Sequence, residues 1–250
     1  MDKKVTVVVL TKNEEHHIVD VIQNAKTITE HVLIVDSGST DRTVELAEAS
    51  GAKVVYRAWD NDFSAQRNFA LQYVNTDWVL YLDADERMNE ELCKDILRSL
   101  KANNDEQYVI KRMSIAFGKK FCYGVLRPDY VPRLFKSTKV KWVNKVHEKP
   151  LCGDKSVVLN GYIEHYTYNS WEQWLVKFNH YTTIWAEDAF LKGKKVNLST
   201  AFAHAFFGFF QMAVLRRGVL DGWMGLALCC QHFFYTLMKY LKLIDLNKIR

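Results

Sequence analysis

The sequence is poor in the residues that mark repetitive, linker-rich or disulfide-stapled proteins. Of its 250 residues only 3 are proline and 11 are glycine, which excludes a collagen-like chain. The five cysteines are odd in number and none stands in a Cys-x-x-Cys pair, so a disulfide framework or a zinc ribbon is not expected and a reducing compartment is. Hydrophobic residues at 48% and charged residues at 25% indicate a folded globular protein.

Acidic residues are scarce in the last quarter of the chain. Residues 190–250 contain nine basic and two acidic residues, a charge of +7, so the preceding residues carry −2 of the total of +5. A basic, aromatic tail on a nearly neutral body indicates a polyanionic partner, either nucleic acid or an anionic membrane. The apolar run Val5–Leu10 is too short for a signal peptide, and charged residues follow it at once. We therefore expect a cytoplasmic protein.

Four short apolar runs alternate with helical patterns in the first hundred residues. The runs are Val5–Leu10, His31–Val35, Lys53–Tyr56 and Trp78–Leu82. Val5–Leu10 and the apolar part of His31–Val35 show no polar alternation, which favours strands of a parallel sheet covered on both sides. This alternation predicts an α/β doubly wound fold.

The segments between and after these runs predict the remaining elements. Apolar residues at helical spacing begin at Ile18, a second helix follows Ser39 or Thr40 as N-cap and ends near Gly51, and a third covers Ser64–Val74. Four later strands are predicted at Gln107–Arg112, Val131–Lys136, Lys139–Val143 and Val157–Leu159. From Ser170 onward only helices are expected.

Polar clusters follow three of the predicted parallel strands. They are Thr11–Glu15 (TKNEE), Asp36–Asp41 (DSGSTD) and Asp83–Asp85 (DAD). Ligands of open α/β sheets bind at the carboxyl ends of the strands, where these clusters should meet. No glycine-rich phosphate loop occurs, and the first glycine is Gly38, so a Rossmann dinucleotide fingerprint and a P-loop are not expected. Each loop taken alone is also compatible with a polar turn that caps a helix.

The chemistry of these clusters points to a nucleotide and a metal. Carboxylates at Asp83 and Asp85 suit a hard divalent cation such as Mg²⁺ or Mn²⁺, which prefers oxygen ligands and shares them with substrate phosphates. A carboxylate at Asp36 could accept the imide N–H of a uracil ring. The three clusters in one sheet therefore predict a nucleotide site.

The sequence resembles glycosyltransferase family 2, whose members have the GT-A fold. The matching segments are VVLTKNEE, LIVDSGSTD, FSAQRNFAL and VLYLDADE. Four later segments resemble the small bacterial glycosyltransferases that add a sugar, often glucose, to the lipopolysaccharide inner core: Arg133–Phe135, Val146–Glu148, Ile163–Tyr166 and Arg217–Gly222. The resemblance spans nearly the whole chain.

The resemblance implies a metal-dependent, inverting glycosyltransferase that uses a UDP-sugar. Asp85 would bind Mg²⁺ or Mn²⁺, Asp83 would contact the ribose or the donor sugar, and Asp36 would recognise the uracil. The implied donor-binding residues are Thr11, Asn13, Glu14, Asp36, Ser37, Arg67, Asn68 and Asp83. The guanidinium group of Arg67 would suit the diphosphate.

Two further residues are candidates for the transfer chemistry. The base of many relatives is an aspartate in a Glu-Asp pair, and here Val146–Glu148 (VHE) occupies that place. Glu148 is therefore the candidate base, with a structural ion pair as the alternative. His165 is a candidate metal ligand, with a core histidine as the alternative.

The helical region predicted after residue 168 carries polar stripes on otherwise apolar helices. In Val196–Leu215 the polar residues Thr200, His204 and Gln211 share one face, and the phenylalanines lie away from it. A second stripe is formed by Gln231, His232, Tyr235, Lys239 and Lys242. This pattern predicts attachment to an anionic membrane interface, ahead of homo-oligomerisation and of a membrane-spanning hairpin. Nucleic acid is not expected, because no basic stripe with exposed aromatics occurs.

We thus expect a catalytic domain over residues 1–168 and a membrane-associating or oligomerising helical region over 169–250. The acceptor would be a lipid-linked glycan at the inner face of the bacterial cytoplasmic membrane. Two other functions compete with this one. A sugar-phosphate nucleotidyltransferase would need a glycine-rich basic loop where TKNEE stands, and a non-catalytic nucleotide-sugar scaffold would not need a candidate base.

Overall fold

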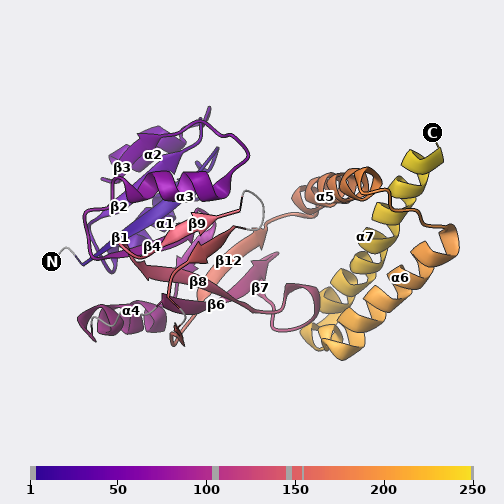
Figure 1. The fold of residues 1–250 in the computed structure, drawn as a ribbon. Helices are drawn as coiled ribbons and strands as arrows, with labels where there is room; N and C mark the ends of the chain where they lie inside the picture. The colour runs from indigo at the N-terminus through magenta and orange to yellow at the C-terminus, as the bar shows by residue number, and fades with distance from the viewer. Residues whose placement is uncertain (1–3, 103–106, 145–147, 154, 249–250) are drawn as a thin grey trace. The chain divides into compact units, whose positions relative to one another are not determined.

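The computed structural model describes residues 4–102, 107–144, 148–153 and 155–248 as two compact units. The first unit comprises Met1–Arg112 and Asp129–His165, and the second comprises Met113–Pro128 and Tyr166–Arg250. The segment 113–128 therefore packs with the C-terminal helices, whereas the sequence analysis assigned it to the catalytic domain. Figure 1 shows the sheet of the first unit and the helices of the second.

The first unit is built on an open sheet with the strand order β3-β2-β1-β4-β8-β6-β12-β5. Its first half contains β1 (Val5–Thr11), α1 (Ile18–Lys26), β2 (Val32–Asp36), α2 (Thr43–Ala49), β3 (Lys53–Tyr56), α3 (Phe63–Leu71) and β4 (Trp78–Asp83). Its second half contains β5 (Glu86–Met88), α4 (Glu90–Ala102), β6 (Gln107–Ala116), β8 (Asp129–Lys136), β9 (Lys141–Val143), β10 (Lys149–Leu151), β11 (Ser156–Val158) and β12 (Ile163–Tyr168). The predicted α/β fold is confirmed.

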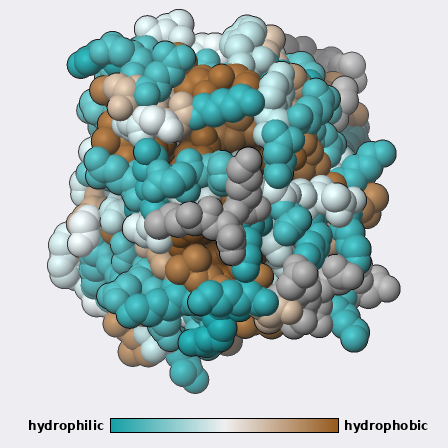
Figure 2. All heavy atoms as spheres, turned by 90° about the vertical axis from the view of Figure 1, so that its left-hand side faces the viewer, coloured by the Kyte–Doolittle hydropathy of each residue, from teal (hydrophilic) through white to brown (hydrophobic). Residues whose placement is uncertain are grey.

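Of the four parallel strands, β1, β2 and β4 are buried on both faces, which explains their uninterrupted apolar runs, whereas the edge strand β3 is partly exposed. On one face Val7 and Val9 pack with residues of α1, α2 and α4, and on the other Val8 packs with residues of α3 and β9. Figure 2 shows the side of the molecule at the left of Figure 1, where hydrophilic side chains surround separate hydrophobic patches.

The strand register brings the predicted polar clusters to one edge of the sheet. Thr11 of β1 is paired with Asp36 of β2, and Leu10 of β1 with Asp83 of β4. The ends of three parallel strands therefore coincide within one residue. This alignment places the loops after β1, β2 and β4 next to each other at the carboxyl edge.

Several details differ from the sequence-based expectations. Helix α2 begins at Thr43 rather than after Ser39 or Thr40, because the Asp41 carboxylate accepts hydrogen bonds from both the backbone N–H and the hydroxyl of Thr43. The patterns above also do not predict β5, α4, β10 or β12. Helix α4 was overlooked although Leu92, Ile96 and Leu100 form a four-residue repeat of buried side chains.

The second unit contains β7 (Lys119–Lys120), η1 (Gly124–Leu126), α5 (Trp171–Leu191), α6 (Leu198–Phe210), η2 (Gln211–Leu215), η3 (Gly218–Asp221) and α7 (Gly222–Lys248). Helix α7 packs against α5 on one side and α6 on another (Figure 1). One segment, Leu198–Leu215, is long and apolar enough to cross a membrane by length and composition, and it is the one such segment within the described residues.

The polar stripes of these helices lie in the seams between them. Lys242 Nζ donates hydrogen bonds to Thr182 Oγ1 and Thr183 Oγ1 of α5 at 3.0 and 2.7 Å. The ring of His204 in α6 stacks on Tyr240 of α7 with 5.0 Å between centroids. Lys242 and His204 thus contact neighbouring helices, while the phenylalanines Phe202, Phe206, Phe207 and Phe210 of α6 are exposed.

Candidate donor and transfer site

The loops after β1 and β2 are joined by hydrogen bonds. Asn13 adopts a left-handed backbone with φ of 58°, and its Oδ1 accepts a 2.8 Å hydrogen bond from the Thr40 N–H. Its own N–H donates to Ser39 Oγ at 2.8 Å, and the Glu14 N–H donates to Thr43 Oγ1 at 2.7 Å. The side chain of Asn13 is therefore used to hold TKNEE against DSGSTD, and asparagine tolerates the left-handed conformation that this requires.

Asp36 is buried at the centre of these loops. Its Oδ2 accepts hydrogen bonds from the N–H groups of Gly38 and Ser39 at 2.8 and 2.9 Å. Its Oδ1 accepts from Ser39 Oγ at 2.5 Å and from Thr11 Oγ1 at 3.4 Å. Four donors match the acceptor capacity of a carboxylate, so Asp36 holds the loop in shape. A uracil ring could bind to Asp36 only by displacing one of these donors.

A cavity of about 260 Å³ opens beside these loops. It is lined by Leu10, Thr11, Lys12, Glu14, Ser37, Trp59, Phe63 and Gln66. The rings of Trp59 and Phe63 lie edge to face with 4.6 Å between centroids. Of the predicted donor residues it includes Thr11, Glu14 and Ser37. Sequence analysis missed Trp59, Phe63 and Gln66, although two aromatics just before and within the FSAQRNFAL segment were a usable signal. Below, we call this space the aromatic-walled donor cavity.

Asp83 ends β4 between two arginines. Arg133 Nη2 lies 2.7 Å from Asp83 Oδ2, and Arg67 Nη2 lies 3.4 Å from Asp83 Oδ1. Burial alone would raise the pKa of Asp83, but the charges of Arg133 and Arg67 outweigh it and hold that pKa well below its usual range. Asp83 is therefore an ionised and strongly positioned carboxylate.

Glu86, which sequence analysis passed over, lies behind Asp83 with no exposed surface. Its Oε1 accepts hydrogen bonds from Arg133 at 2.6 Å and from Arg112 at 3.3 Å, and its Oε2 accepts from the Asp83 N–H. Burial raises the pKa of Glu86. Together these groups form a network in which three arginines from distant strands and helices hold the acidic turn after β4. We call Arg67, Arg112 and Arg133 the arginine triad.

Arg67 connects this turn to the candidate base. Its guanidinium group is sandwiched near the rings of Trp142 and Tyr81, at 4.7 and 5.2 Å from their centroids. Its Nη2 lies 3.6 Å from Glu148 Oε1 as well as 3.4 Å from Asp83. Because Arg67 is only 4% exposed, it holds these carboxylates rather than reaching out to a diphosphate.

Asn68 is also used inside the protein. Its Nδ2 donates to the Trp142 carbonyl at 2.8 Å, and its Oδ1 accepts from the Trp142 N–H at 2.9 Å. The side chain thereby fixes β9 to α3. These two bonds use one N–H and one lone pair of the amide, so a donor molecule could reach it only through the remaining N–H or lone pair.

Glu148 and Asp83 line a second cavity of about 230 Å³. The arginine triad, Trp142 and three residues of β8 and β10 complete its wall: Val131, Pro132 and Pro150. The structure thus brings the candidate base to the end of β4, about 60 residues away along the chain. Of the VHE segment, Val146 and His147 lie outside the described residues. We call this space the transfer cavity.

The arginine triad gives a direct prediction for stability. Arg133→Met should destabilise the protein by about 3–5 kcal/mol, because it leaves the fully buried Glu86 and the partly exposed Asp83 without their shared partner. Arg98→Met is the matched control: Arg98 pairs with Asp95 but its side chain is 76% exposed, so the cost should stay below about 1 kcal/mol. Urea unfolding of both variants measures the difference, and equal costs would show that the network does not stabilise the acidic turn.

Asp85 and His165 form the candidate metal site. Asp85 Oδ2 lies 3.3 Å from His165 Nε2, and both side chains are about one quarter exposed. Among the described residues no group of three or more His, Cys, Asp or Glu side chains could hold a metal ion. The pair fits a divalent cation that completes its shell with substrate phosphates and water, since Mg²⁺ commonly takes only one or two protein ligands and imidazole is acceptable to Mn²⁺.

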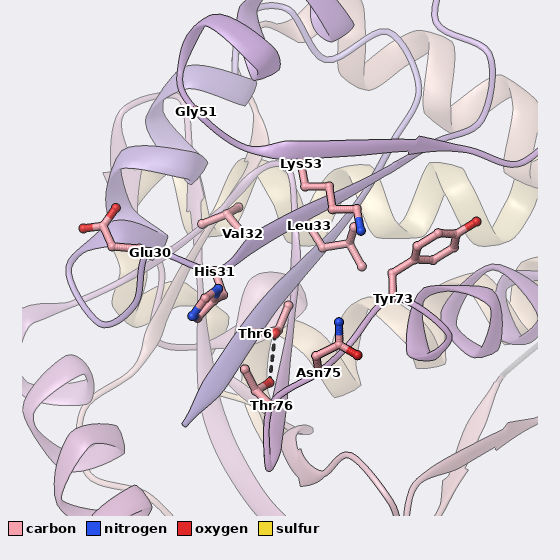
Figure 3. Close-up of a pocket in the computed structure, with 10 residues that line it drawn as sticks. All are labelled: Thr6, Glu30, His31, Val32, Leu33, Gly51, Lys53, Tyr73, Asn75 and Thr76. Carbon is pink, nitrogen blue, oxygen red and sulfur yellow. Dashed lines mark hydrogen bonds between the residues drawn. The ribbon is translucent and has the colours of Figure 1, made fainter. Parts of the chain in front are cut away.

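A further cavity of about 260 Å³ lies at the opposite, amino edge of the same parallel strands. Figure 3 shows Thr6, Val32 and Lys53 around it, each within the first two residues of β1, β2 and β3. The hydroxyls of Thr6 and Thr76 bond to each other at 2.8 Å, and Thr76 also donates to the Trp78 carbonyl. Open α/β sheets bind substrates at the carboxyl edge, so this cavity is not a candidate active site.

Comparison with protein families gives one match, to the family described as Glycosyl transferase family 2, over residues 6–153. Among curated proteins the chain is 29% identical to an uncharacterized glycosyltransferase of Rickettsia prowazekii, covering 98% of this chain and 88% of the relative. It is 29% identical to another from Rickettsia conorii, covering 99% and 91%. The glycosyltransferase SunS of Bacillus subtilis is 25% identical over 62% of this chain and 37% of its own length.

Solved structures similar to this chain include glucosyl-3-phosphoglycerate synthase from Mycobacterium tuberculosis. In its complex with Mn²⁺, uridine diphosphate and phosphoglyceric acid the TM-score is 0.40 at 20% identity, covering 54% of this chain and 56% of that one. In its complex with Mg²⁺ and uridine diphosphate the TM-score is 0.37 at 24% identity, covering 46% and 44%.

Proposed function

We propose that this chain, which belongs to glycosyl transferase family 2 and is built on the GT-A fold, moves a sugar from a UDP-sugar to a lipid-linked glycan such as the lipopolysaccharide inner core. The resemblance favours glucose as that sugar. The observation that carries the proposal is the common edge of β1, β2 and β4. There the aromatic-walled donor cavity, the acidic turn and the candidate base Glu148 are assembled from loops of a single unit.

The donor would bind with its nucleoside in the aromatic-walled donor cavity. The faces of Trp59 and Phe63 suit a flat base, and Ser37, Thr11 and Glu14 offer hydrogen bonds along the wall. Asp36 would accept the uracil imide N–H after release of the Ser39 hydroxyl, which is the donor free to rotate. Asn13, Arg67 and Asn68 do not contact the donor in this arrangement. They hold in place the loops and carboxylates that line the site.

Asp85 and His165 would hold Mg²⁺ or Mn²⁺ against the donor diphosphate. When bound, the cation neutralises the charge that builds up on the departing diphosphate. Asp83 contacts the ribose or donor sugar from its fixed position between Arg133 and Arg67. The charges of Arg133 and Arg67 thus serve to position the carboxylate of Asp83.

Glu148 is the proposed general base. Its carboxylate takes the proton of the acceptor hydroxyl as that oxygen forms a bond to the anomeric carbon. The bond from the anomeric carbon to the diphosphate oxygen breaks with its electron pair leaving on the diphosphate, so attack from the opposite face inverts the configuration. The Arg67 guanidinium, 3.6 Å from Glu148, orients the base.

The helical unit supports an acceptor that stays in a membrane. Four phenylalanines of α6, namely Phe202, Phe206, Phe207 and Phe210, are 40–62% exposed. Trp223 at the start of α7 is 73% exposed, and Arg216 and Arg217 stand between the two helices. An exposed apolar face with a basic rim suits the interface of an anionic membrane.

A membrane-spanning arrangement is less compatible with the packing. Helix α5 is bonded to α7 through Lys242, and it carries charged residues including Glu172 and Asp188. A spanning α7 would draw this helix into the hydrocarbon region at a high cost. We therefore propose interfacial attachment at the inner face of the bacterial cytoplasmic membrane, with self-association through the same apolar face as the competing arrangement.

Removal of the exposed phenylalanines tests this attachment. The double variant Phe207→Ser, Phe210→Ser should bind vesicles of phosphatidylglycerol and phosphatidylethanolamine at least about tenfold more weakly, because each buried phenyl contributes roughly 1.5–3 kcal/mol. Leu191→Ser is the control, since Leu191 is 84% exposed but lies at the end of α5. Equal vesicle binding by all three proteins would contradict the proposal, and resistance of the parent to alkaline carbonate would indicate a spanning helix instead.

Calorimetric titration tests the proposed function itself. UDP and a series of UDP-sugars are titrated with Mn²⁺ or with chelator. Metal-dependent binding is expected, and the strongest sugar identifies the donor. If no uridine compound binds in the presence of metal, the donor assignment is wrong. If a UDP-sugar binds but no envelope lipid receives the sugar, the protein is a non-catalytic nucleotide-sugar scaffold.

A further inference from the structure

A fourth cavity lies wholly within the helical unit and belongs to none of the sites above. It has a volume of about 220 Å³ and opens among α5, α7, η1 and the end of β12. Its aromatic wall is formed by Trp174, Phe178, Tyr168 and Tyr235. Gln231 and His232 lie on the same side of α7 as Tyr235 and complete it with polar groups. We call it the helical-unit cavity.

The aromatic wall is preorganised. Trp174 and Phe178 are four residues apart on one face of α5, with 5.1 Å between their ring centroids. Phe178 in turn packs against Tyr235 of α7 edge to face at 5.8 Å. Tyr235 and the ring of His232 are nearly parallel, with an angle of 13° between their planes. Two helices therefore present fixed ring faces around one space.

The polar groups of this cavity make no hydrogen bond with the residues that the structure describes. Within the described part of the chain, the side chains of Tyr168, Gln231, His232 and Tyr235 take part in no hydrogen bond with the protein. Burial, and then the nearby cations Lys239 and Arg216, lower the pKa of His232. Its imidazole is therefore neutral near neutral pH and both donates and accepts a hydrogen bond. Convergent polar groups of this kind in an aromatic cavity mark a ligand site.

The surrounding charges exclude a cationic ligand. Lys177 Nζ lies 5.3 Å from the centroid of Tyr168, and Lys239 Nζ lies 5.7 Å from that of Tyr235. These lysines already occupy the outer faces of two of the rings. None of the described residues that line the cavity is a carboxylate. An aromatic cage for an ammonium group would need the opposite electrostatics.

A hydrocarbon chain is excluded by the polar groups. It would cover three phenols, an amide and an imidazole without giving them a hydrogen bond, and each covered group would then be unsatisfied. A ring with hydroxyls at its edge and C–H groups on its faces meets both demands. The volume lies below the roughly 300–1,000 Å³ of typical drug-sized ligand sites, which fits one sugar ring rather than a nucleotide.

We propose that the helical-unit cavity binds one pyranose ring of a glycan, as a docking subsite separate from the donor and transfer cavities. This inference rests on the proposed function only for the source of the sugar, which would be the acceptor glycan. The site itself is defined by the packed rings of Trp174, Phe178 and Tyr235 and by the side chains of Gln231 and His232, which make no hydrogen bond with the described residues.

Saturation-transfer difference NMR tests the proposal with the full-length protein and without nucleotide or metal. The probes are the methyl glycosides of glucose, galactose, N-acetylglucosamine and a heptose, with glycerol as the non-carbohydrate polyol. At least one glycoside should give a signal that glycerol does not. Tyr235→Leu, which removes a ring face, and His232→Leu, which removes only the polar edge, should each reduce that signal at least fivefold.

Trp223→Leu is the matched control, because Trp223 is a 73% exposed aromatic of the same helix outside the cavity, and its signal should equal that of the parent. Thermal unfolding of each variant confirms that the helical unit is folded. The proposal is overturned if no glycoside exceeds glycerol, or if folded His232→Leu retains the parental signal. Since UDP-sugar binding is measured separately by calorimetry, failure of this subsite and failure of the proposed transferase are distinguishable results.

Discussion

Asp85→Ala is expected to lower sugar transfer by about a thousandfold or more while leaving the fold intact. The carboxylate lies 3.3 Å from His165 and is 27% exposed, so its removal empties half of the candidate metal site without opening a buried cavity. A cation that stabilises the departing diphosphate contributes several kcal/mol to the barrier, and each 1.4 kcal/mol corresponds to a factor of ten in rate. The measurement is UDP release with a saturating donor, together with a Mn²⁺ titration.

The control for this variant is Asp188→Ala, which removes an exposed aspartate that pairs only with Lys192. It should retain parental activity and parental Mn²⁺ affinity. Transfer by Asp85→Ala within tenfold of the parent would show that the metal lies elsewhere. Loss of activity with unchanged Mn²⁺ binding would assign Asp85 to the donor instead.

Glu148→Gln is expected to reduce kcat by about 10²–10⁴-fold with little change in the affinity for UDP-sugar. The substitution keeps the shape and the acceptor oxygen that faces Arg67 Nη2, but it removes the capacity to take a proton. Single-turnover transfer measures the chemical step, and calorimetry measures donor binding. The donor cavity and the transfer cavity, which contains Glu148, share no lining residue. The substitution should therefore lower the transfer rate without changing donor binding.

Glu90→Gln is the control for the base, since Glu90 is an exposed residue of α4 that pairs only with Lys94. It should be indistinguishable from the parent. If Glu148→Gln transfers sugar at a rate within threefold of the parent, Glu148 is a structural partner of Arg67. Asp83 would then be a poor substitute candidate, because its arginine partners hold its pKa below the usual range and weaken it as a base.

The sequence was sufficient to predict the parallel half of the sheet. Strands β1 and β4 begin at the expected residues, since strands buried on both faces produce apolar runs with sharp polar ends. The same polar ends located the candidate site, because the carboxyl termini of parallel strands share one edge. The α/β class and the acidic turn Asp83–Asp85 therefore required only local patterns.

The arginine triad could not be predicted in this way. Arg67, Arg112 and Arg133 lie on α3, β6 and β8, and their convergence depends on the antiparallel insertion of β8 and β6 beside β4. No spacing in the chain encodes that contact. Arg67 was consequently predicted to bind the donor, although its burial between Trp142 and Tyr81 makes it a positioning residue.

The C-terminal helices show a different limit. Their polar stripes are evident from the three- and four-residue spacing, but the direction in which a stripe faces is a tertiary property. A helix at a membrane surface usually turns its polar stripe to water. In the structure Lys242 of α7 contacts α5 and His204 of α6 contacts α7. Only the packing of the three helices reveals these contacts.

The arginine triad also has a consequence for the order in which substrates enter. Its three guanidinium groups are already matched by Asp83, Glu86 and Glu148, and the Asp85 carboxylate lies nearby. The carboxyl edge therefore has no surplus positive charge with which to attract a nucleoside diphosphate from solution. We expect donor and divalent cation to arrive as a single electrically balanced complex and the spent nucleotide to leave in the same form. The turnover of this glycosyltransferase would then be coupled to the free divalent ion of its compartment.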